Sequence, residues 1–266
     1  MKITSIGHGT CLIEIGGQAF LTDPCFSERL LFFFPRRRKA GLSPAELPPL
    51  SAILVSHAHY DHLDVFSYKY FKTEIPIIVP QGLGGFVSRF LPNPVVEIPE
   101  GGKHLHRDVE IHAQAVKHHG CRWMPWRWRA ASAFVLKAPK ESVYFCGDSG
   151  FGEHFRRTGE KFTLDAALLP IGGSQPRWLT RHSKMSPDEA LEAFRDLKAK
   201  QMVPINWGVF DFFGEGIDTA EKRMAELVRE KNLSDRIQLL QPGKSLEFGE
   251  ASLGLQPPSP ARKRKG

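Results

Sequence analysis

The chain has 266 residues, of which 41% are hydrophobic, so it can bury the core of one domain or of two tightly fused halves. It carries 36 Lys and Arg against 29 Asp and Glu, and no run approaches the roughly 20 apolar residues that span a bilayer. The four cysteines lie far apart, which predicts reduced thiols rather than a disulfide framework, and therefore a cytoplasmic protein.

The net charge of +7 is partly local, because the last five residues contribute four of these positive charges. We expect a folded domain over residues 1–250 and a disordered, basic tail over residues 251–266. Such a tail could bind nucleic acid or anionic lipid, or it could serve only to keep the chain in solution.

The N-terminal region predicts a β-hairpin. Residues 2–15 alternate loosely between apolar and polar side chains, and a Gly-Gly turn leads into a strand over residues 19–22. His8 interrupts this region, either as a hydrogen-bonded structural histidine or as a side chain that faces a site. Asp23 ends the second strand, where its carboxylate is suited to orient the imidazole of a metal ligand.

Residues 30–39 join an apolar run to a basic run. Phe32, Phe33 and Phe34 precede Arg36 and three further cations. This composition is typical of a segment in a membrane interface, with rings in the acyl boundary and cations on anionic headgroups. The alternative is an apolar helix that packs inward and ends in a solvated basic turn.

A dense histidine cluster follows a buried strand predicted over residues 52–55. His57, His59, Asp61 and His62 place three imidazoles and one carboxylate within six positions. The end of a strand directs His57 and His59 to one side, and a following helical turn brings Asp61 and His62 beside them. Nitrogen and oxygen ligands of this kind favour zinc and similar metals, so the sequence predicts a metal site.

Beyond the cluster we expect strands over residues 77–79, 95–98 and 109–112, and a helix over residues 82–90. The last strand runs towards His118 and His119, of which strand alternation directs only one inward. Residues 122–129 then interleave three tryptophans, among them Trp126, with three arginines. This mixture suits a loop at a lipid surface, or one that caps an apolar, anionic substrate, better than a nucleic-acid site.

The second half predicts further strands over residues 132–136, 142–145, 166–171, 202–205 and 237–240, and helices over 186–197 and 219–231. Ser186 begins a capping box with proline at the first helical position. Asp148 follows a buried strand on a sharp turn framed by glycines, which suits it to bridge two metal ions. Strands and helices in both halves fit two similar β-then-α halves packed face to face.

The motifs H-x-H-x-D-H at residues 57–62 and G-D-S-G at 147–150 resemble the signature of the metallo-β-lactamase superfamily of hydrolases. Over roughly residues 7–210 the chain is most similar to the N-acyl phosphatidylethanolamine phospholipase D family and its bacterial relatives. The flanking segments that carry this resemblance are residues 7–10, 21–27, 46–49, 170–173, 176–178, 186–190 and 207–208. The resemblance implies an α/β fold, a four-layer αββα sandwich.

The resemblance also implies how the ligands divide. One metal would be held by His57, His59, His118 and Asp148, and the other by Asp61, His62, Asp148 and Asn206. His118 is favoured over His119 because a basic residue follows it four positions later. Two positions depart from the relatives, which carry histidine where this chain has Lys184 and Asn206. Asparagine is the weaker ligand, so we expect a weaker second metal, whose charge Lys184 partly replaces.

The implied chemistry is hydrolysis by metal-activated water, with Asp61, Asp148 and Lys184 at the reacting centre. Zinc is expected at the first site, with manganese or iron as alternatives, and occupancy of the second site is left open. The favoured substrate is a phosphodiester of a phospholipid headgroup, met by Arg177 and the apolar segments at the inner face of the membrane. The alternatives are a soluble ester, lactone or nucleotide phosphodiester, or a non-catalytic protein that keeps the fold.

Overall fold

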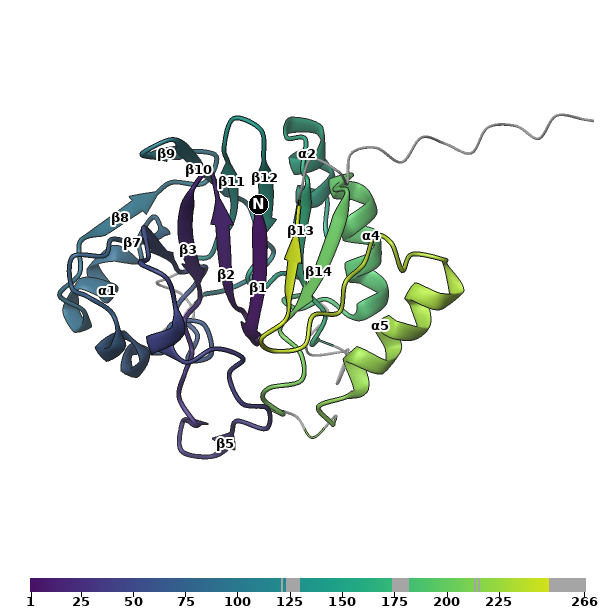
Figure 1. Cartoon of the computed structure of the whole chain (residues 1–266), viewed down its shortest axis with the longest axis horizontal. Coiled ribbons are helices and arrows are strands. Elements are labelled where there is room, and N and C mark those ends of the chain that lie inside the picture. The colour runs from purple at the N-terminus through teal and green to yellow at the C-terminus, as the bar shows by residue number, and fades with distance from the viewer. Residues whose placement is uncertain (121, 123–129, 174–181, 213, 215, 249–266) are drawn as a thin grey trace, which may run out of the picture.

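The computed structural model describes residues 1–120, 122, 130–173, 182–212, 214 and 216–248 (Figure 1). Two β-sheets lie face to face, and helices cover the outer face of each sheet. The predicted four-layer αββα sandwich is thereby confirmed. Trp126, Arg177 and the tail over residues 251–266 lie outside the described residues, so the domain boundary at residue 250 stays a prediction.

The first sheet has the strand order β15-β1-β2-β3-β6-β7-β8. Its strands β3, β6, β7 and β8 pair in parallel, whereas β1 pairs antiparallel with both of its neighbours. The bounds are β1 (Lys2–Gly7), β2 (Thr10–Ile15), β3 (Gln18–Thr22), β6 (Ala52–Leu54), β7 (Ile77–Pro80), β8 (Val95–Ile98) and β15 (Ser245–Glu247).

The second sheet has the order β14-β13-β12-β11-β10-β9. Strands β12, β13 and β14 pair in parallel, and the others pair antiparallel. The bounds are β9 (Lys103–His106), β10 (Val109–Gln114), β11 (Ala133–Lys137), β12 (Ser142–Phe145), β13 (Ala166–Pro170) and β14 (Gln201–Ile205).

The remaining elements are helices and one small hairpin. The bounds of the helices are α1 (Gly84–Phe90), α2 (His154–Lys161), α4 (Pro187–Leu197), α5 (Thr219–Glu230), and the 3-10 helices η1 (Pro44–Glu46) and η2 (Val65–Tyr70). The hairpin pairs β4 (Arg29–Leu30) with β5 (Phe34–Pro35) and projects at the bottom of Figure 1. Among the described residues, no helix combines the length and apolar character needed to cross a membrane.

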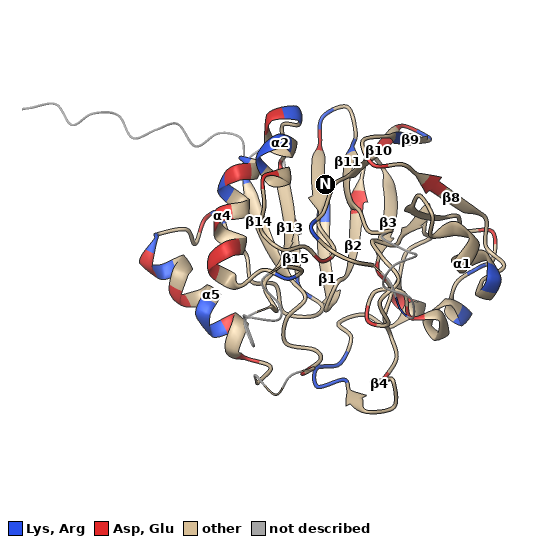
Figure 2. Cartoon of the chain, turned by 180° about the vertical axis from the view of Figure 1, so that it is seen from behind, with Lys and Arg blue, Asp and Glu red and all other residues tan. Residues whose placement is uncertain are grey.

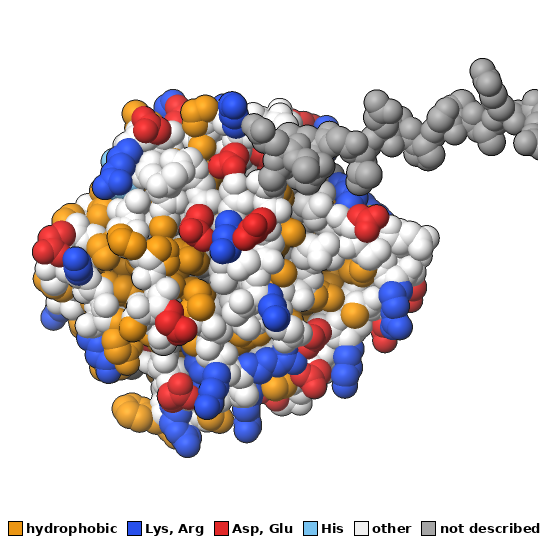
Figure 3. All heavy atoms as spheres, in the orientation of Figure 1, with side chains coloured by type: hydrophobic (Ala, Val, Ile, Leu, Met, Phe, Trp, Pro, Cys, Tyr) orange, Lys and Arg blue, Asp and Glu red, His pale blue; other side chains and the backbone are white. Residues whose placement is uncertain are grey.

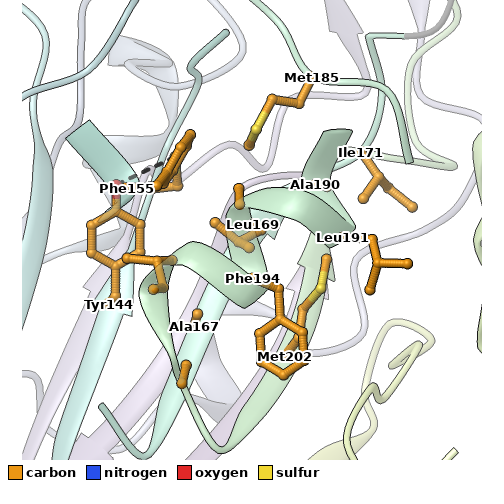
Figure 4. Packing of buried hydrophobic residues seen from close by; sticks show 14 of the residues in the cluster. Tyr144, Phe155, Ala167, Leu169, Ile171, Met185, Ala190, Leu191, Phe194 and Met202 are labelled. Atoms are coloured by element: carbon orange, nitrogen blue, oxygen red, sulfur yellow. Dashed lines mark hydrogen bonds between the residues drawn. The ribbon is translucent and has the colours of Figure 1, made fainter. Parts of the chain in front are cut away.

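Side-chain periodicity explains the layers. Alternate residues of neighbouring strands, such as Ile13 and Ile15 on β2, fill the core between the sheets. On the outer face of the second sheet, Leu191 and Phe194 of α4 pack with Phe155 of α2 over the strands (Figure 4). Helix α4 begins as predicted, with the Ser186 hydroxyl accepting a hydrogen bond from the Glu189 amide.

Two local expectations are corrected, and one helix was not predicted. Residues 237–240 form no strand: Ile237 makes one isolated bridge to Met202, and the Leu240 amide donates back to Gln238, which curls the chain away from the sheet. The closing strand is β15, which pairs with β1. The run at residues 30–39 forms the hairpin and not an inward-packed helix. Helix α2 was not predicted, because only Phe155 and Thr158 of this helix are buried and they form no apolar stripe in the sequence.

Candidate metal centre

Six strands end at the same edge of the sandwich, and each is followed by one polar residue of the site. The strands β1, β3, β6, β10, β12 and β14 are followed within four positions by His8, Asp23, His57, His118, Asp148 and Asn206. Within each sheet these strands run in the same direction, so their carboxyl ends meet at one edge. This geometry places ligands from distant parts of the chain around one point.

Three histidines and one carboxylate form the first group. The ligand atoms of His57, His59, His118 and Asp148 all lie within 4.8 Å of one another. The Nδ1 atom of His59 is 2.9 Å from Nε2 of His57 and 3.2 Å from Nε2 of His118. The Asp148 Oδ2 atom is 3.9 Å from each of those Nε2 atoms. His119 is exposed, so the structure places His118 and not its neighbour in this group.

Hydrogen bonds assign the protons on two of these rings. Nδ1 of His118 donates to the Ser183 carbonyl at 2.8 Å. Nδ1 of His57 donates to the Ser56 hydroxyl at 2.9 Å, because that hydroxyl itself donates to Asp23 at 2.6 Å. The Nε2 atoms of His57 and His118 therefore present lone pairs. Three ring nitrogens thus meet with at most one proton between them, an arrangement that fits a metal cation.

The electrostatics favour the same protonation states. Burial lowers the pKa of His57 well below its ordinary value, and burial lowers the pKa of His118 to about 4. Burial raises the pKa of Asp148, but Lys184 and the neighbouring histidines outweigh it and hold that pKa below the usual carboxyl range. At neutral pH the imidazoles are neutral and the carboxylate is charged, which metal binding requires.

A second group lies on the other side of Asp148. The ligand atoms of His8, Asp61 and His62 also lie within 4.8 Å of one another. Nε2 of His8 donates to Asp61 Oδ2 at 2.8 Å, and Nε2 of His62 lies 3.6 Å from Asp148 Oδ2. Burial lowers the pKa of His62, but Asp61, Asp148 and Asp23 outweigh it and raise that pKa to about 9.

Asp23 supports both groups. Its Oδ2 atom accepts the Nδ1 proton of His62 at 2.6 Å, and through Ser56 it orients His57. The structure thus brings Asp23 to the place expected for an orienting carboxylate. Sequence reasoning missed Ser56 and Ser183 as hydrogen-bond partners, and only the position of Ser56 directly before His57 hinted at its role.

Lys184 and Asn206 both turn inward. The Asn206 amide donates to Asp148 Oδ1 at 2.6 Å, and the Lys184 Nζ atom lies 3.5 Å from Asp148 Oδ2. Among the described residues, four buried polar atoms here lack a hydrogen-bond partner: His8 Nδ1, His62 Nε2, Asp148 Oδ2 and Asn206 Oδ1. Because buried polar atoms are seldom unpaired, this cluster also fits a bound ion or water.

Backbone strain gathers at the same residues. His8, Asp23 and Asn206 have φ angles of 57°, 36° and 56°, in the left-handed region that residues other than glycine rarely adopt. A Cβ atom at position 9 would lie 2.9 Å from the Asn206 side-chain oxygen, so glycine there lets the β1–β2 turn approach the site. Strain of this kind is typical of functional sites.

The hairpin of β4 and β5 carries the phenylalanines expected at a membrane. Phe32 is 88% exposed and Phe33 is 81% exposed, whereas Phe34 is half-buried and packs on Phe212 at 5.1 Å. Arg36, also expected at the membrane, instead donates to the Cys25 and Ser27 carbonyls at the base of the hairpin.

Basic residues follow this hairpin along the chain (Figure 2). At the lower end of the molecule in Figure 3, hydrophobic side chains protrude beside several Lys and Arg. Arg37 and Lys39 are exposed there, whereas the Arg38 guanidinium binds Asp218 and Glu221. Only part of the basic run is therefore available to an anionic partner.

Known proteins are similar to this chain in sequence and in fold. The profile of the β-lactamase superfamily domain matches residues 18–207. N-acyl-phosphatidylethanolamine-hydrolyzing phospholipase D 1 of Caenorhabditis elegans is 31% identical over 226 residues, which are 78% of this chain and 64% of that protein. A UPF0173 metal-dependent hydrolase of Methylacidiphilum infernorum is 27% identical over 85% of this chain and 93% of its own length.

The chain spans less than two thirds of the length of that phospholipase D. Among solved structures, a metallo hydrolase of the archaeon Ignicoccus hospitalis has a TM-score of 0.71 at 19% identity, over 93% of this chain and 99% of that one. This similarity shows the fold, and the domain match and the sequence relatives show the family. The chain belongs to the metallo-β-lactamase superfamily of metal-dependent hydrolases.

Proposed function

We propose that this hydrolase cleaves a phosphodiester bond in the headgroup of a phospholipid at a membrane surface, with zinc as its metal. The observation that carries the proposal is the hairpin of β4 and β5, which exposes two phenylalanines and whose Phe34 packs on Phe212, near His8 of the metal centre. Leaving two such rings in water forgoes about 1.5–3 kcal/mol of burial each, so a partner that covers them is expected.

The turn of the hairpin keeps these rings outside. Leu31 and Phe32 belong to the three-residue loop between the paired Leu30 and Phe34, and their φ angles of 48° and 62° lie in the left-handed region that favours glycine or asparagine. A bulky residue held in this conformation is strained by roughly 1–3 kcal/mol. A strained turn with apolar side chains at its tip is suited to enter the acyl boundary, with Arg37 and Lys39 at the headgroups.

The base of the hairpin leads to the metal centre. Phe34 packs on Phe212, whose ring centroid is 6.3 Å from that of His8. The Lys184 Nζ atom lies 5.6 Å from the same Phe212 ring. An aromatic wall of Phe34 and Phe212 therefore connects the base of the hairpin to the polar centre, so we expect a headgroup held at the hairpin to lie near the ligands.

The residues of the centre would divide the work. His57, His59, His118 and Asp148 would hold the metal, which lowers the pKa of water and polarises a phosphoryl oxygen. Asp148 and Asp61, both ionised, would accept hydrogen bonds from an attacking water and orient it. Lys184 would lie beside the phosphoryl oxygens as their negative charge develops, and the aromatic wall would limit the access of bulk water.

The relatives support a lipid substrate. The Caenorhabditis elegans relative is named for the hydrolysis of N-acyl-phosphatidylethanolamine. We take the same class of substrate for this chain, because its hairpin supplies an independent reason for contact with lipid.

The test separates lipid from soluble substrates. Vesicles of phosphatidylcholine, with and without anionic phosphatidylglycerol, are sedimented with the protein, and hydrolysis of vesicle-borne N-acyl phosphatidylethanolamine is compared with that of a soluble phosphodiester. Replacing Phe32 and Phe33 by serine should lower vesicle binding and lipid hydrolysis at least tenfold and leave soluble turnover unchanged. Leu105→Ser, at an apolar side chain 62% exposed on β9 and paired with the start of β10, away from the strand ends of the metal centre, is the matched control.

Efficient hydrolysis of a soluble ester, lactone or diester without any vesicle binding would replace the lipid proposal by a soluble substrate. Vesicle binding that persists undiminished in the Phe32 and Phe33 variant would remove the hairpin from the account.

A further inference from the structure

Asp148 is shared among several cationic or donor groups. Its Oδ1 atom is occupied by the Asn206 amide at 2.6 Å. Its Oδ2 atom lies 3.5 Å from Lys184 Nζ and 3.6 Å from His62 Nε2. The same atom lies 3.9 Å from the Nε2 atoms of His57 and His118. One carboxylate oxygen therefore faces both the proposed metal and a lysine ammonium.

The position of Lys184 is built into the fold. It precedes the Ser186 cap of α4 by two residues, next to the fully buried Met185. The Gly173 amide donates to the Met185 carbonyl, and a Cβ atom at position 173 would lie 2.4 Å from the Lys184 Cβ atom. The lysine backbone is thus held against the segment after β13, and its side chain, 23% exposed, points to Asp148.

The buried charges around Asp148 support one metal rather than two. Asp23, Asp61 and Asp148 are all buried and place three negative charges in the centre. One divalent ion and the Lys184 ammonium supply three positive charges, before any proton on His62 is counted. A second divalent ion would leave excess positive charge in a buried site, which is costly unless it is paired. Asp64 and Arg122 nearby are of opposite charge and leave this balance unchanged.

Residues on the side of the second group already make hydrogen bonds within the protein. Its Asp61 already accepts the proton of His8 Nε2, and a metal ion bound by Asp61 through the same oxygen would have to compete with that hydrogen bond. Asn206, on the same side, directs its amide nitrogen and not its oxygen to Asp148. A pocket lined by His8, Lys184, Asn206, Phe210 and Phe212 opens beside these groups, with room for a small anion.

We propose that the working centre holds one tightly bound metal ion, at His57, His59, His118 and Asp148, and that Lys184 supplies the second positive charge. In this arrangement the Lys184 ammonium binds an anionic oxygen of the substrate, such as a phosphoryl oxygen, directly. The inference rests on the metal-dependent hydrolysis stated above but not on the lipid nature of the substrate.

The first experiment counts metal. The full-length chain is stripped with a chelator, reloaded with zinc, dialysed and measured by elemental analysis and native mass spectrometry. We expect one tightly bound zinc per chain, and nearly two when Lys184→His and Asn206→His are combined. Two equally tight zinc ions in the unmodified protein would overturn the proposal, and so would a double variant that still binds one.

The second experiment measures anion binding without any turnover. Calorimetry with inorganic phosphate on the zinc-loaded protein should show affinity reduced roughly tenfold or more by Lys184→Met and largely kept by Lys184→Arg, since an ammonium or guanidinium donates charge-assisted hydrogen bonds to phosphate. Lys222→Met, at an exposed lysine of α5, is the matched control. Unchanged phosphate affinity in a folded Lys184→Met variant would refute the role of this lysine.

Because both readouts are independent of activity, they separate this inference from the proposed substrate. If the protein binds one zinc and needs Lys184 to bind phosphate but does not bind vesicles, the inference is supported and the lipid substrate is refuted. A protein that binds no zinc at all would overturn both.

Discussion

The two sides of Asp148 lie at the same edge of the sandwich but present different groups to its carboxylate. On the histidine side, His57 and His118 each donate one ring proton to a fixed acceptor and turn the other nitrogen towards a common point. On the lysine side, an ammonium and an amide already contact the carboxylate. One side is prepared for a metal ion, while the other is already partly neutralised by protein groups.

This difference also appears in proton affinity. His118 and His62 are both buried, but burial lowers the pKa of His118 to about 4, whereas three carboxylates outweigh burial and raise the pKa of His62 to about 9. A neutral imidazole can bind a metal ion, and a protonated one cannot. The contrast shows how neighbouring charges give identical side chains opposite tendencies within one centre.

The largest effect should come from removing a ligand on the histidine side. His118→Ala is expected to abolish tight zinc binding, with a loss greater than the 10–100-fold that follows when a supporting residue is removed. His119→Ala, at the exposed neighbour, should leave zinc binding within about twofold on the same scale. Zinc titration monitored by calorimetry measures both. A silent His118→Ala together with a damaging His119→Ala would reverse the assignment.

A smaller loss of zinc affinity should follow from changing Asp23, which accepts a hydrogen bond from His62 and orients His57 through Ser56. Asp23→Asn keeps the size and tolerates the positive φ angle, but its amide nitrogen would replace one of the two oxygens that accept from the Ser56 amide, the Ser56 hydroxyl and His62, so it cannot accept all three hydrogen bonds. We expect zinc affinity to fall about 10–100-fold. Ser56→Ala interrupts only the link to His57 and should cost less. Equal losses in the two variants would mean that His62 gains nothing from Asp23.

The smallest effect concerns the pH dependence of the metal-free protein. A pKa of about 9 for His62 means that its stabilisation is complete below the unfolded value of 6.5 and is lost as the pH rises through 9. For His118 the folded pKa is the lower one, so stability falls as the pH drops from 6.5 towards 4, because the unfolded chain binds the proton more tightly.

Urea unfolding of the metal-free protein should therefore show about 2 kcal/mol less stability at pH 9 than at pH 7 that is attributable to His62. His62→Gln should remove this difference, and His118→Gln should instead flatten the decline between pH 6.5 and pH 4. Identical pH profiles for the parent protein and His62→Gln would erase the contrast between the two sides.

Local sequence was sufficient for much of this centre. The spacing of His57, His59 and His62 places three imidazoles in one short segment whatever the remaining fold. The glycine before Asp148 is required because a Cβ atom at position 147 would collide with Ser56, and such a constraint is visible as a motif. Strand periodicity and the capping box of α4 are also local properties, and they predicted strands and helices in both halves, while the resemblance of the motifs implied the αββα architecture.

Contacts between distant segments decided the rest. Which of His118 and His119 faces the centre depends on the Ser183 carbonyl, which lies far along the chain. The inward turn of Lys184 depends on Gly173 and the carboxylate of Asp148, and residues 30–39 became a hairpin because Arg36 and Phe34 found partners near its base. Periodicity shows which side of an element is apolar, but only the packed chain sets the distances and charges that decide what the partly buried Lys184 and the buried Asn206 do.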